Sequence, residues 1–145
     1  MLEKSFSNVY TKFKLNFYKK IFSRFETREA SLTAVETFCV EVIGSVPSLT
    51  INEFAKFVNI SQANATYKVQ SLIEKGYVTK TRSEKDKREY LLTVTEKFDR
   101  FCGISKEYVH TVVGRMKERF TEEEIQIFHR MLDTIDTELM PEVQI

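Results

Sequence analysis

Polar residues between positions 61 and 71 have the types and spacing needed for hydrogen bonds to the edges of DNA bases. The apolar residues of this stretch recur every three or four positions, as on the buried side of a helix: Ala65, Val69, Leu72 and Ile73. The opposite side would then be polar but almost uncharged: Gln62, Ala63, Asn64, Tyr67, Gln70 and Ser71. Amides, hydroxyls and a phenol match the donors and acceptors of base edges. A helix side that meets only water is usually filled with Glu and Lys, so the pattern favours nucleic-acid contact.

Positive charge is concentrated beside this stretch, although the net charge of the chain is only +1. Residues 61–90 carry seven basic and four acidic groups, whereas residues 91–145 carry seven and eleven. DNA phosphates require a locally positive surface rather than a positive whole protein. The cations expected to contact phosphates or to charge the neighbouring hairpin are Lys68, Lys75, Lys80, Arg82, Lys85, Lys87 and Arg88.

Capping signals divide the central stretch into two helices. Thr50 and Glu53 have the spacing of a capping box, which starts a helix at the next residue. Asn59 is expected to end that helix, because asparagine tolerates a left-handed conformation. Ser61 caps the second helix, and Gly76 ends it.

A hairpin is predicted directly after the second helix. Residues 89–95 alternate between apolar and more polar side chains, as in a half-buried strand, and residues 77–81 can pair with them antiparallel. Residues 82–88 are too polar to bury and form the tip. The order of elements predicts a mainly α fold with a small β-hairpin, the winged helix-turn-helix, which places one helix in the major groove of DNA.

Residues 49–95 resemble the core of the MarR family of bacterial transcriptional regulators. Members share a Leu-Thr start, a Leu-Glu-Lys-Gly-like end of the recognition helix, and an Asp-x-Arg wing closed by a Leu-x-x-Thr strand. In this sequence the elements are Leu49-Thr50, Leu72-Ile73-Glu74-Lys75-Gly76, Asp86-Lys87-Arg88 and Leu92-Thr93-Val94-Thr95. The match is specific over about a third of the chain.

The resemblance implies roles for individual residues. Asp86 and Arg88 would pair to stiffen the wing, Lys87 would point into the minor groove, and Asn64 and Tyr67 would face bases or phosphates in the major groove. Many members have arginine where this chain has Lys87 and Tyr67, which leaves the preferred base sequence open. The full set of expected DNA-contacting residues is Ser61, Gln62, Ala63, Asn64, Thr66, Tyr67, Lys68, Gln70, Ser71, Arg82, Lys85, Lys87 and Arg88.

Amphipathic segments flank the central module. The first 25 residues carry a broad aromatic stripe at helical spacing: Phe6, Val9, Tyr10, Phe13, Phe17, Ile21 and Phe25. One further helix is expected from Thr95 or Glu96 to Phe120, and a last one from the capping box of Thr121 and Glu124 to Pro141. The chain's own core could cover these stripes, but their extent favours a second subunit.

A homodimer would explain how one short helix finds a particular sequence. Two recognition helices related by a twofold axis would meet successive major grooves, so the preferred site would be a near-palindrome. We therefore expect an N-terminal dimerisation helix in residues 1–30, the DNA-binding domain in 31–95 and C-terminal dimerisation helices in 96–145.

Residues 31–44 are predicted to form a structural helix beneath the helix-turn-helix. Thr33 and Glu36 make a further capping box, Gly44 is expected to end the helix, and Pro47 prevents its continuation.

An effector site is a further expectation from the family resemblance. It would lie in the cleft between the dimerisation helices and the DNA-binding lobe. Aromatic residues near this cleft suit an apolar or aromatic effector, although such stripes are also typical of a core: Phe13, Phe17, Tyr18 and Phe38. The overall expectation is a dimeric, ligand-responsive transcriptional regulator, a repressor as is usual in the family it resembles.

Other function classes find little support in the sequence. It has no Gly-rich phosphate loop, nucleophile elbow or HExxH motif, which argues against an enzyme, and we expect no cofactor. His110 and His129 lack the partners for a metal site. Cys39 and Cys102 suit buried apolar positions and a reducing cytoplasm, and no run approaches the length of a membrane span. The alternatives are a winged-helix protein-interaction module without DNA binding and a cysteine-based redox-sensing regulator.

Overall fold

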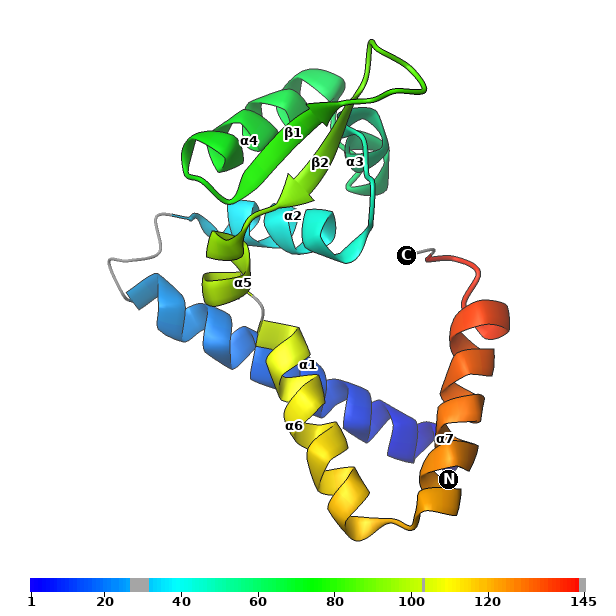
Figure 1. Ribbon diagram of the computed structural model, residues 1–145. Helices are drawn as coiled ribbons and strands as arrows, with labels where there is room; N and C mark the ends of the chain where they lie inside the picture. Colours follow the sequence, from blue (N-terminus) through cyan, green and yellow to red (C-terminus); the bar gives the residue numbers. More distant parts are fainter. Residues whose placement is uncertain (27–31, 103, 144–145) are drawn as a thin grey trace. The chain divides into compact units, whose positions relative to one another are not determined.

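The computed structural model describes residues 1–26, 32–102 and 104–143, which divide into two compact units (Figure 1). One unit is Ile21–Gly103, and the other combines Met1–Lys20 with Ile104–Ile145. The expected domain boundaries at residues 30 and 95 stay a prediction, and position 31, the expected helix start, lies outside the described residues.

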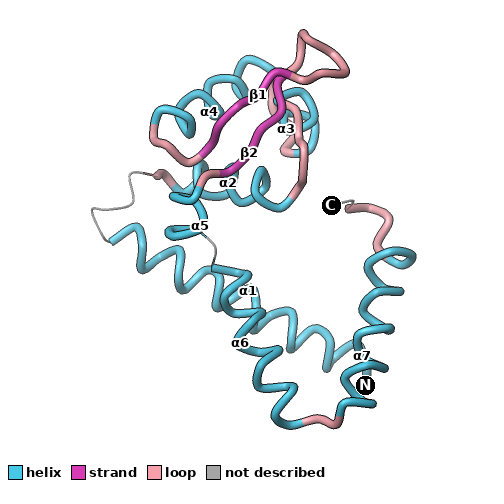
Figure 2. Tube along the Cα trace, in the orientation of Figure 1, coloured by secondary structure: helices cyan, strands magenta, loops and turns pink. Residues whose placement is uncertain are grey.

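The unit Ile21–Gly103 packs helices against a two-stranded hairpin (Figures 1 and 2). Its elements are α2 (Ala34–Ser45), α3 (Ile51–Phe57), α4 (Gln62–Glu74), β1 (Val78–Arg82), β2 (Tyr90–Val94) and α5 (Glu96–Cys102). The strands are antiparallel, from the pair Val78 and Val94 to the pair Arg82 and Tyr90. The mainly α fold with a small hairpin is confirmed.

The predicted helix boundaries in this unit rest on observed caps. Complete capping boxes start α2 and α3 at Thr33 and Thr50, and the Ser61 hydroxyl caps α4. Asn59 and Gly76 both have positive φ, 55° and 82°, as the ends of α3 and α4 require. The turn signals of the sequence were therefore sufficient to place α3 and α4.

An additional bridge joins the start of α3 to the hairpin. Thr50 pairs antiparallel with Leu91, and the Leu92 amide donates to the Leu49 carbonyl at 2.8 Å. This long-range contact has no local sequence signal. It holds the wing against the helix-turn-helix.

The apolar core of the unit lies between α2, α3, α4 and the hairpin. Its most completely buried side chains are Val40, Phe54, Val69, Leu72, Tyr77 and Val78. The predicted core side of α4 is confirmed, because Ala65, Val69 and Leu72 are buried.

The prediction that Gly44 ends its helix is wrong. Helix α2 continues to Ser45, and Gly44 lies inside it. A Cβ at Gly44 would lie 2.7 Å from Cζ of Phe98, so glycine is needed for the close packing of the Phe98 ring on α2. Close approach to a residue 54 positions away leaves no local signal in the sequence.

The other unit contains α1 (Leu2–Glu26) as far as Lys20, together with α6 (Ile104–Arg119) and α7 (Glu122–Thr134), and α7 continues as a π-helical turn, η1 (Ile135–Leu139). Phe13 on α1 meets Tyr108 on α6 edge to face, with ring centroids 5.2 Å apart. The capping box of Thr121 and Glu124 is confirmed. Helices α5 and α6 lie on either side of position 103, which is outside the described residues, so the predicted single helix from Thr95 or Glu96 to Phe120 stays a prediction.

None of the described residues of this unit is buried, although its helices carry large apolar side chains. Phe6, Tyr10 and Met131 are each more than half exposed, at 57%, 59% and 57%. None of the described helices is both long enough and apolar enough to cross a membrane.

Candidate nucleic-acid interface

Helix α4 presents its predicted polar side to the surface. Gln62, Ala63, Asn64, Tyr67 and Gln70 are exposed, and Tyr67 is 76% exposed. The Ser61 side chain accepts a hydrogen bond from the Asn64 amide at 3.2 Å, which fixes the first turn. The Tyr67 phenol and the Asn64 amide are therefore exposed to an external partner, whereas the Gln70 amide donates to Glu74 Oε1 at 3.1 Å on the helix surface.

The wing is ordered by contacts within its own loop. Both Asp86 oxygens accept hydrogen bonds from the Arg88 guanidinium, at 3.1 and 3.2 Å, and Asp86 Oδ1 also accepts from the Arg88 amide at 3.0 Å. These bonds lower the pKa of the Asp86 carboxyl. Arg82 Nε donates to the Lys87 carbonyl across the loop. The pairing expected from the family resemblance is present, and its role in stiffening the wing stays a prediction.

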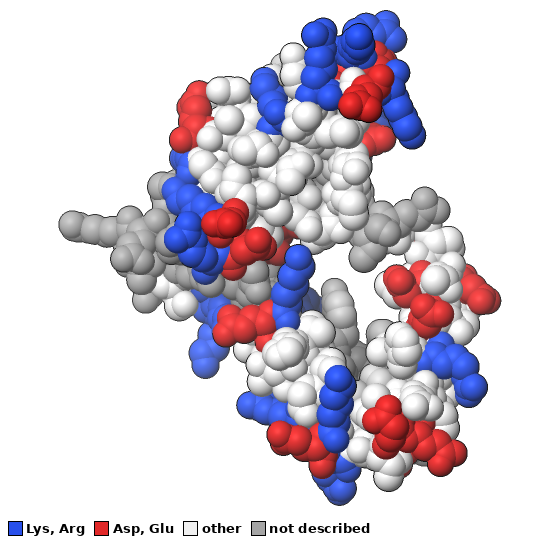
Figure 3. Space-filling model, viewed as in Figure 1, with Lys and Arg blue, Asp and Glu red and all other residues white. Residues whose placement is uncertain are grey.

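Basic side chains gather at the wing tip, with acidic ones among them (Figure 3). Lys85, Lys87 and Arg88 are exposed there, next to Glu84 and Asp86. Arg82 and Arg88 each donate hydrogen bonds within the loop, and Lys87 is exposed. The tip thus exposes charge on a loop whose backbone is fixed.

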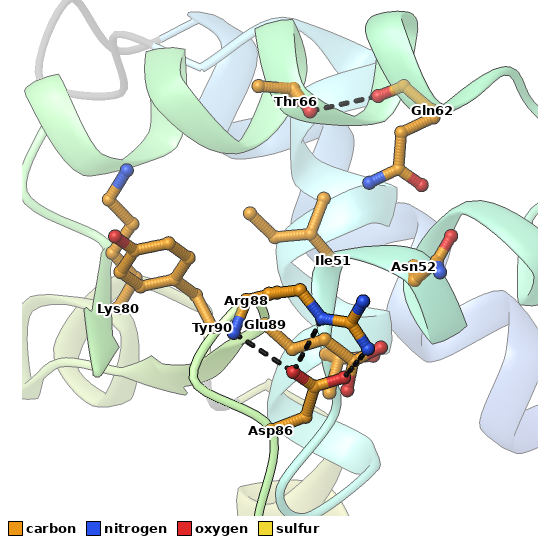
Figure 4. A pocket seen from close by; sticks show the side chains of 10 residues that line it. Ile51, Asn52, Gln62, Thr66, Lys80, Asp86, Arg88, Glu89 and Tyr90 are labelled. Atoms are coloured by element: carbon orange, nitrogen blue, oxygen red, sulfur yellow. Dashed lines mark hydrogen bonds and ion pairs between the residues drawn. The ribbon is translucent and has the colours of Figure 1, made fainter. Parts of the chain in front are cut away.

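A groove of about 510 Å³ lies between the wing and the helix-turn-helix (Figure 4). It is lined by Thr50, Ile51, Asn52, Gln62, Thr66, Lys80, Asp86, Arg88, Glu89 and Tyr90. Lys80 Nζ lies 4.9 Å from the centre of the Tyr90 ring, which places this cation beside the groove. Sequence reasoning did not find Ile51, Asn52 or Tyr90, because the bridge that brings the wing to α3 has no local signal.

Ser71 of α4 and Lys75, the residue that caps its C-terminus, contact α2. Ser71 Oγ donates to Glu36 Oε1 at 2.6 Å, and Lys75 Nζ lies 2.8 Å from Glu36 Oε2. Burial alone would raise the pKa of the Glu36 carboxyl, but the hydrogen bonds from Lys75, Ser71 and the Thr33 amide, with the Lys75 charge, lower it to about 2. We therefore do not include Ser71 or Lys75 among the proposed DNA contacts.

The remaining α4 and wing residues of the predicted set lie on the surface of this unit. Thr66 is exposed, although its hydroxyl donates to the Gln62 carbonyl, and Lys68 is half-buried. Their contact with DNA stays a prediction.

Other predicted site residues are not part of this surface. Phe13, Phe17 and Tyr18 belong to one unit and Phe38 to the other. Cys39 is buried, and burial raises the pKa of its thiol despite the nearby Lys68 charge, which leaves the sulfur mostly protonated at neutral pH. The Cys102 side chain lies outside what the structure describes. Among the described residues, no three His, Cys, Asp or Glu side chains group as metal ligands do.

Residues 32–90, which include α2, α3, α4 and the wing as far as Tyr90, match the family model described as MarR family. This segment is a MarR-family domain. The HTH-type transcriptional regulator BilQ of Clostridium symbiosum is 28% identical to the chain over 131 residues, which are 88% of each protein. Both matches are therefore to transcriptional regulators rather than to enzymes.

Solved structures support the same fold for the whole chain. A MarR family protein from Bacillus stearothermophilus is 20% identical, with a TM-score of 0.63, over 95% of this chain and 92% of that one. FabT of Streptococcus pneumoniae, solved in complex with DNA, is 22% identical, with a TM-score of 0.59, over 95% and 94%. The winged helix-turn-helix prediction is confirmed.

Proposed function

We propose that this protein is a homodimeric regulator that binds a near-palindromic DNA site through α4 and the wing. The observation that carries the proposal is the exposed side of α4, which offers amides and a phenol at Asn64, Tyr67 and Gln70. Such groups recognise base edges in the major groove. The solved DNA complex of FabT, a protein of the same fold, is consistent with this use of the fold.

The proposed contacts divide into two kinds. Residues of the first turns of α4 would read bases or contact phosphates: Ser61, Gln62, Ala63, Asn64, Thr66, Tyr67, Lys68 and Gln70. Wing residues would contact phosphates or enter the minor groove, with Lys87 at the tip: Arg82, Lys85, Lys87 and Arg88. Arg88 would also hold the wing through Asp86. Because the wing residues would contact phosphates, we expect the affinity for DNA to fall steeply as the salt concentration rises.

Dimerisation is supported by the apolar surface of α1, α6 and α7. On α7, Phe128 and Leu132 are 43% and 44% exposed, and no residue of this helix is buried. Large exposed apolar surfaces on soluble chains mark interaction sites. A second copy of the chain would cover these helices through the same surface on both subunits, as twofold symmetry requires.

We also propose that a small-molecule effector controls DNA binding. An apolar or aromatic effector would shift the protein toward a spacing of its two DNA-binding units that fits the operator poorly, and so relieve repression. The aromatic residues proposed to contact it are Phe13, Phe17, Tyr18 and Phe38. Tyr18 and Phe38 are 40% and 47% exposed, so both can be reached by a small molecule.

The proposal is tested by binding of a labelled duplex from the chain's own upstream region, with an unrelated duplex beside it, at about 50 and 200 mM salt. We expect binding to both at low salt, a clear preference for the upstream duplex, and a loss of affinity of at least about a hundredfold at high salt. If neither duplex binds in a salt-sensitive way, the DNA-binding function is wrong, and a protein-interaction module becomes the better reading.

A further inference from the structure

Glu36 is a buried acidic residue whose oxygens are fully occupied. It is 9% exposed and stands at the third position of α2. Oε2 accepts hydrogen bonds from the Thr33 amide and from Lys75 Nζ, both at 2.8 Å. Oε1 accepts from Ser71 Oγ at 2.6 Å and from Lys75 Nζ at 3.0 Å. Two of its partners, 35 and 39 residues away in sequence, are Ser71 on the recognition helix and Lys75, which caps that helix.

Helix capping alone does not account for these contacts. The chain has two other capping boxes of the same type, in which Glu53 and Glu124 bond to Thr50 and Thr121. Both glutamates are exposed, and in the described part of the chain their hydrogen bonds stay within the box. Glu36 therefore differs from Glu53 and Glu124 in that it also bonds to residues outside its capping box, Ser71 and Lys75.

The contacts fix one edge of the recognition helix. Asn64, Lys68, Ser71 and Lys75 follow each other at intervals of three or four residues, so they form one row along α4. Glu36 holds the C-terminal end of this row, and Asn64 lies at its N-terminal end, where a recognition helix contacts bases.

Because α4 is long, the contacts that fix its C-terminal end also determine where its N-terminal end lies. A helix of 13 residues is about 20 Å long, so a tilt of about 5° at one end moves the other by about 1.7 Å. Hydrogen-bond distances vary over only about 0.5 Å, so such a movement would break contacts to base edges. Phosphate contacts from flexible lysines would survive it, because a point charge needs no fixed geometry.

The same helix end is also held from α5. Lys97 Nζ donates to the Lys75 carbonyl at 2.7 Å and lies 4.6 Å from the centre of the Tyr77 ring. The last turn of α4 is thus fixed through the Lys75 main chain by Lys97 and through the Lys75 side chain by Glu36. Removal of one contact would change the direction of α4 without releasing the helix.

We propose that Glu36, which lies outside the recognition helix, is a positioning residue for DNA recognition that fixes the direction of α4 through Ser71 and Lys75. The inference rests on the proposed function. It also implies that the Lys75 charge is used inside the protein and contributes little to DNA attraction. Glu36 determines sequence preference rather than overall affinity.

The test compares the full-length wild type with Glu36→Gln and Glu124→Gln on two duplexes. One duplex is selected by the wild type from a random pool, and the other is unrelated. Glutamine can still close a capping box, so Glu36→Gln removes the charged contact with Lys75 while the box is kept. Glu124→Gln makes the same change of charge in an exposed box and controls for it.

Glu36→Gln is expected to lose about tenfold in affinity for the selected duplex and less than about twofold for the unrelated one, with an unchanged salt slope. Glu124→Gln should keep the wild-type preference. Equal losses of Glu36→Gln on both duplexes, or no loss on either, would overturn the positioning role. If Glu36→Gln fails to fold, Ser71→Ala decides the question by the same comparison, because it removes the 2.6 Å bond and leaves the Lys75 pair.

Binding of the wild-type protein to the two duplexes tests the proposed function separately from the role of Glu36. If the wild type binds neither duplex in a salt-sensitive way, the proposed function fails and the positioning role fails with it. If the wild type selects a duplex and Glu36→Gln selects it equally well, only the positioning role fails.

Discussion

Arg88 binds both carboxylate oxygens of Asp86, with Nε 3.1 Å from Oδ1 and Nη2 3.2 Å from Oδ2. The Arg88 side chain is 90% exposed, so this pair contributes mainly to the shape of the wing rather than to the stability of the fold. Asp86→Asn should therefore weaken DNA binding several-fold while the melting temperature stays within about 2 °C of the wild type. Duplex titration and thermal unfolding measure the two effects.

Glu84→Gln is the matched control for the wing, because it removes an exposed negative charge from the same loop. Loss of that charge alone should strengthen binding slightly. If Asp86→Asn also strengthens binding, the Asp86–Arg88 pair has no role in holding the wing for DNA.

Lys87 supplies an exposed charge at the wing tip, and its side chain is the one proposed to enter the minor groove. Lys87→Ala should weaken binding about three- to tenfold at 0.1 M salt and reduce the slope of log affinity against log salt by about one. The oligomeric state should not change. Lys106→Ala, an exposed lysine on α6, should alter neither value, and an unchanged slope for Lys87→Ala would remove the wing tip from the interface.

The low pKa of Glu36 makes part of the stability depend on pH. The carboxyl has a pKa of about 2 in the folded protein and 4.5 as its ordinary value. The unfolded chain therefore binds a proton first as pH falls, so this contribution is complete above about pH 5.5 and is lost as the pH falls through 4.5 toward 2. The linkage corresponds to about 3 kcal/mol of unfolding free energy at neutral pH.

Denaturant unfolding of wild type and Glu36→Gln at several pH values measures this contribution. The wild type should be more stable at pH 7, and the difference should close between pH 5 and pH 2. A difference that stays constant over this range would show that the charge of Glu36 is not what stabilises the fold.

Gly44 is the point of closest approach between α2 and the Phe98 ring. Gly44→Ala would place a methyl group 2.7 Å from Phe98 Cζ and should cost about 1–3 kcal/mol of unfolding free energy. Gly114→Ala is the matched control, since a Cβ at Gly114 on α6 meets no described atom within 4 Å. That change should stabilise by about 0.5–1 kcal/mol through helix propensity. If both substitutions stabilise the protein, the contact with Phe98 does not require glycine.

Because we propose that the apolar surface of α7 forms part of the dimer interface, a charge placed on this surface should disrupt the dimer. Leu132 is 44% exposed in the single chain, so Leu132→Glu should fold but should shift the protein from dimer to monomer in sedimentation. Gln126→Glu adds the same charge at an exposed position of the helix and should remain dimeric. A dimeric Leu132→Glu would place the interface elsewhere.

Much of this fold could be predicted because its signals are local. Thr50 with Glu53, Asn59, Ser61 and Gly76 each act within a few residues, so spacing alone placed α3 and α4. The exposed side of α4 followed from the three- and four-residue recurrence of its apolar residues.

The parts that could not be predicted depend on contacts between distant residues. The sequence around Gly44 predicts a helix end, because the partner of this glycine, Phe98, cannot be known from the neighbouring residues. Helical spacing predicts Ser71 on the DNA-facing side, but its hydroxyl donates to Glu36 on α2. Glu36 itself has the sequence signature of an ordinary capping residue, and only the packing of α2 against α4 gives it further partners.

The central claim is that α4 and the wing form the surface that binds DNA. Amide NMR of the full-length protein, with and without the upstream duplex, tests it directly because each residue reports separately. The account predicts that the amides of residues 61–70 and 82–88 shift on addition of the duplex, while those around Val35 and Phe38 on the exposed side of α2 do not. Shifts confined to α1, α6 and α7, or no shifts at all, would contradict it.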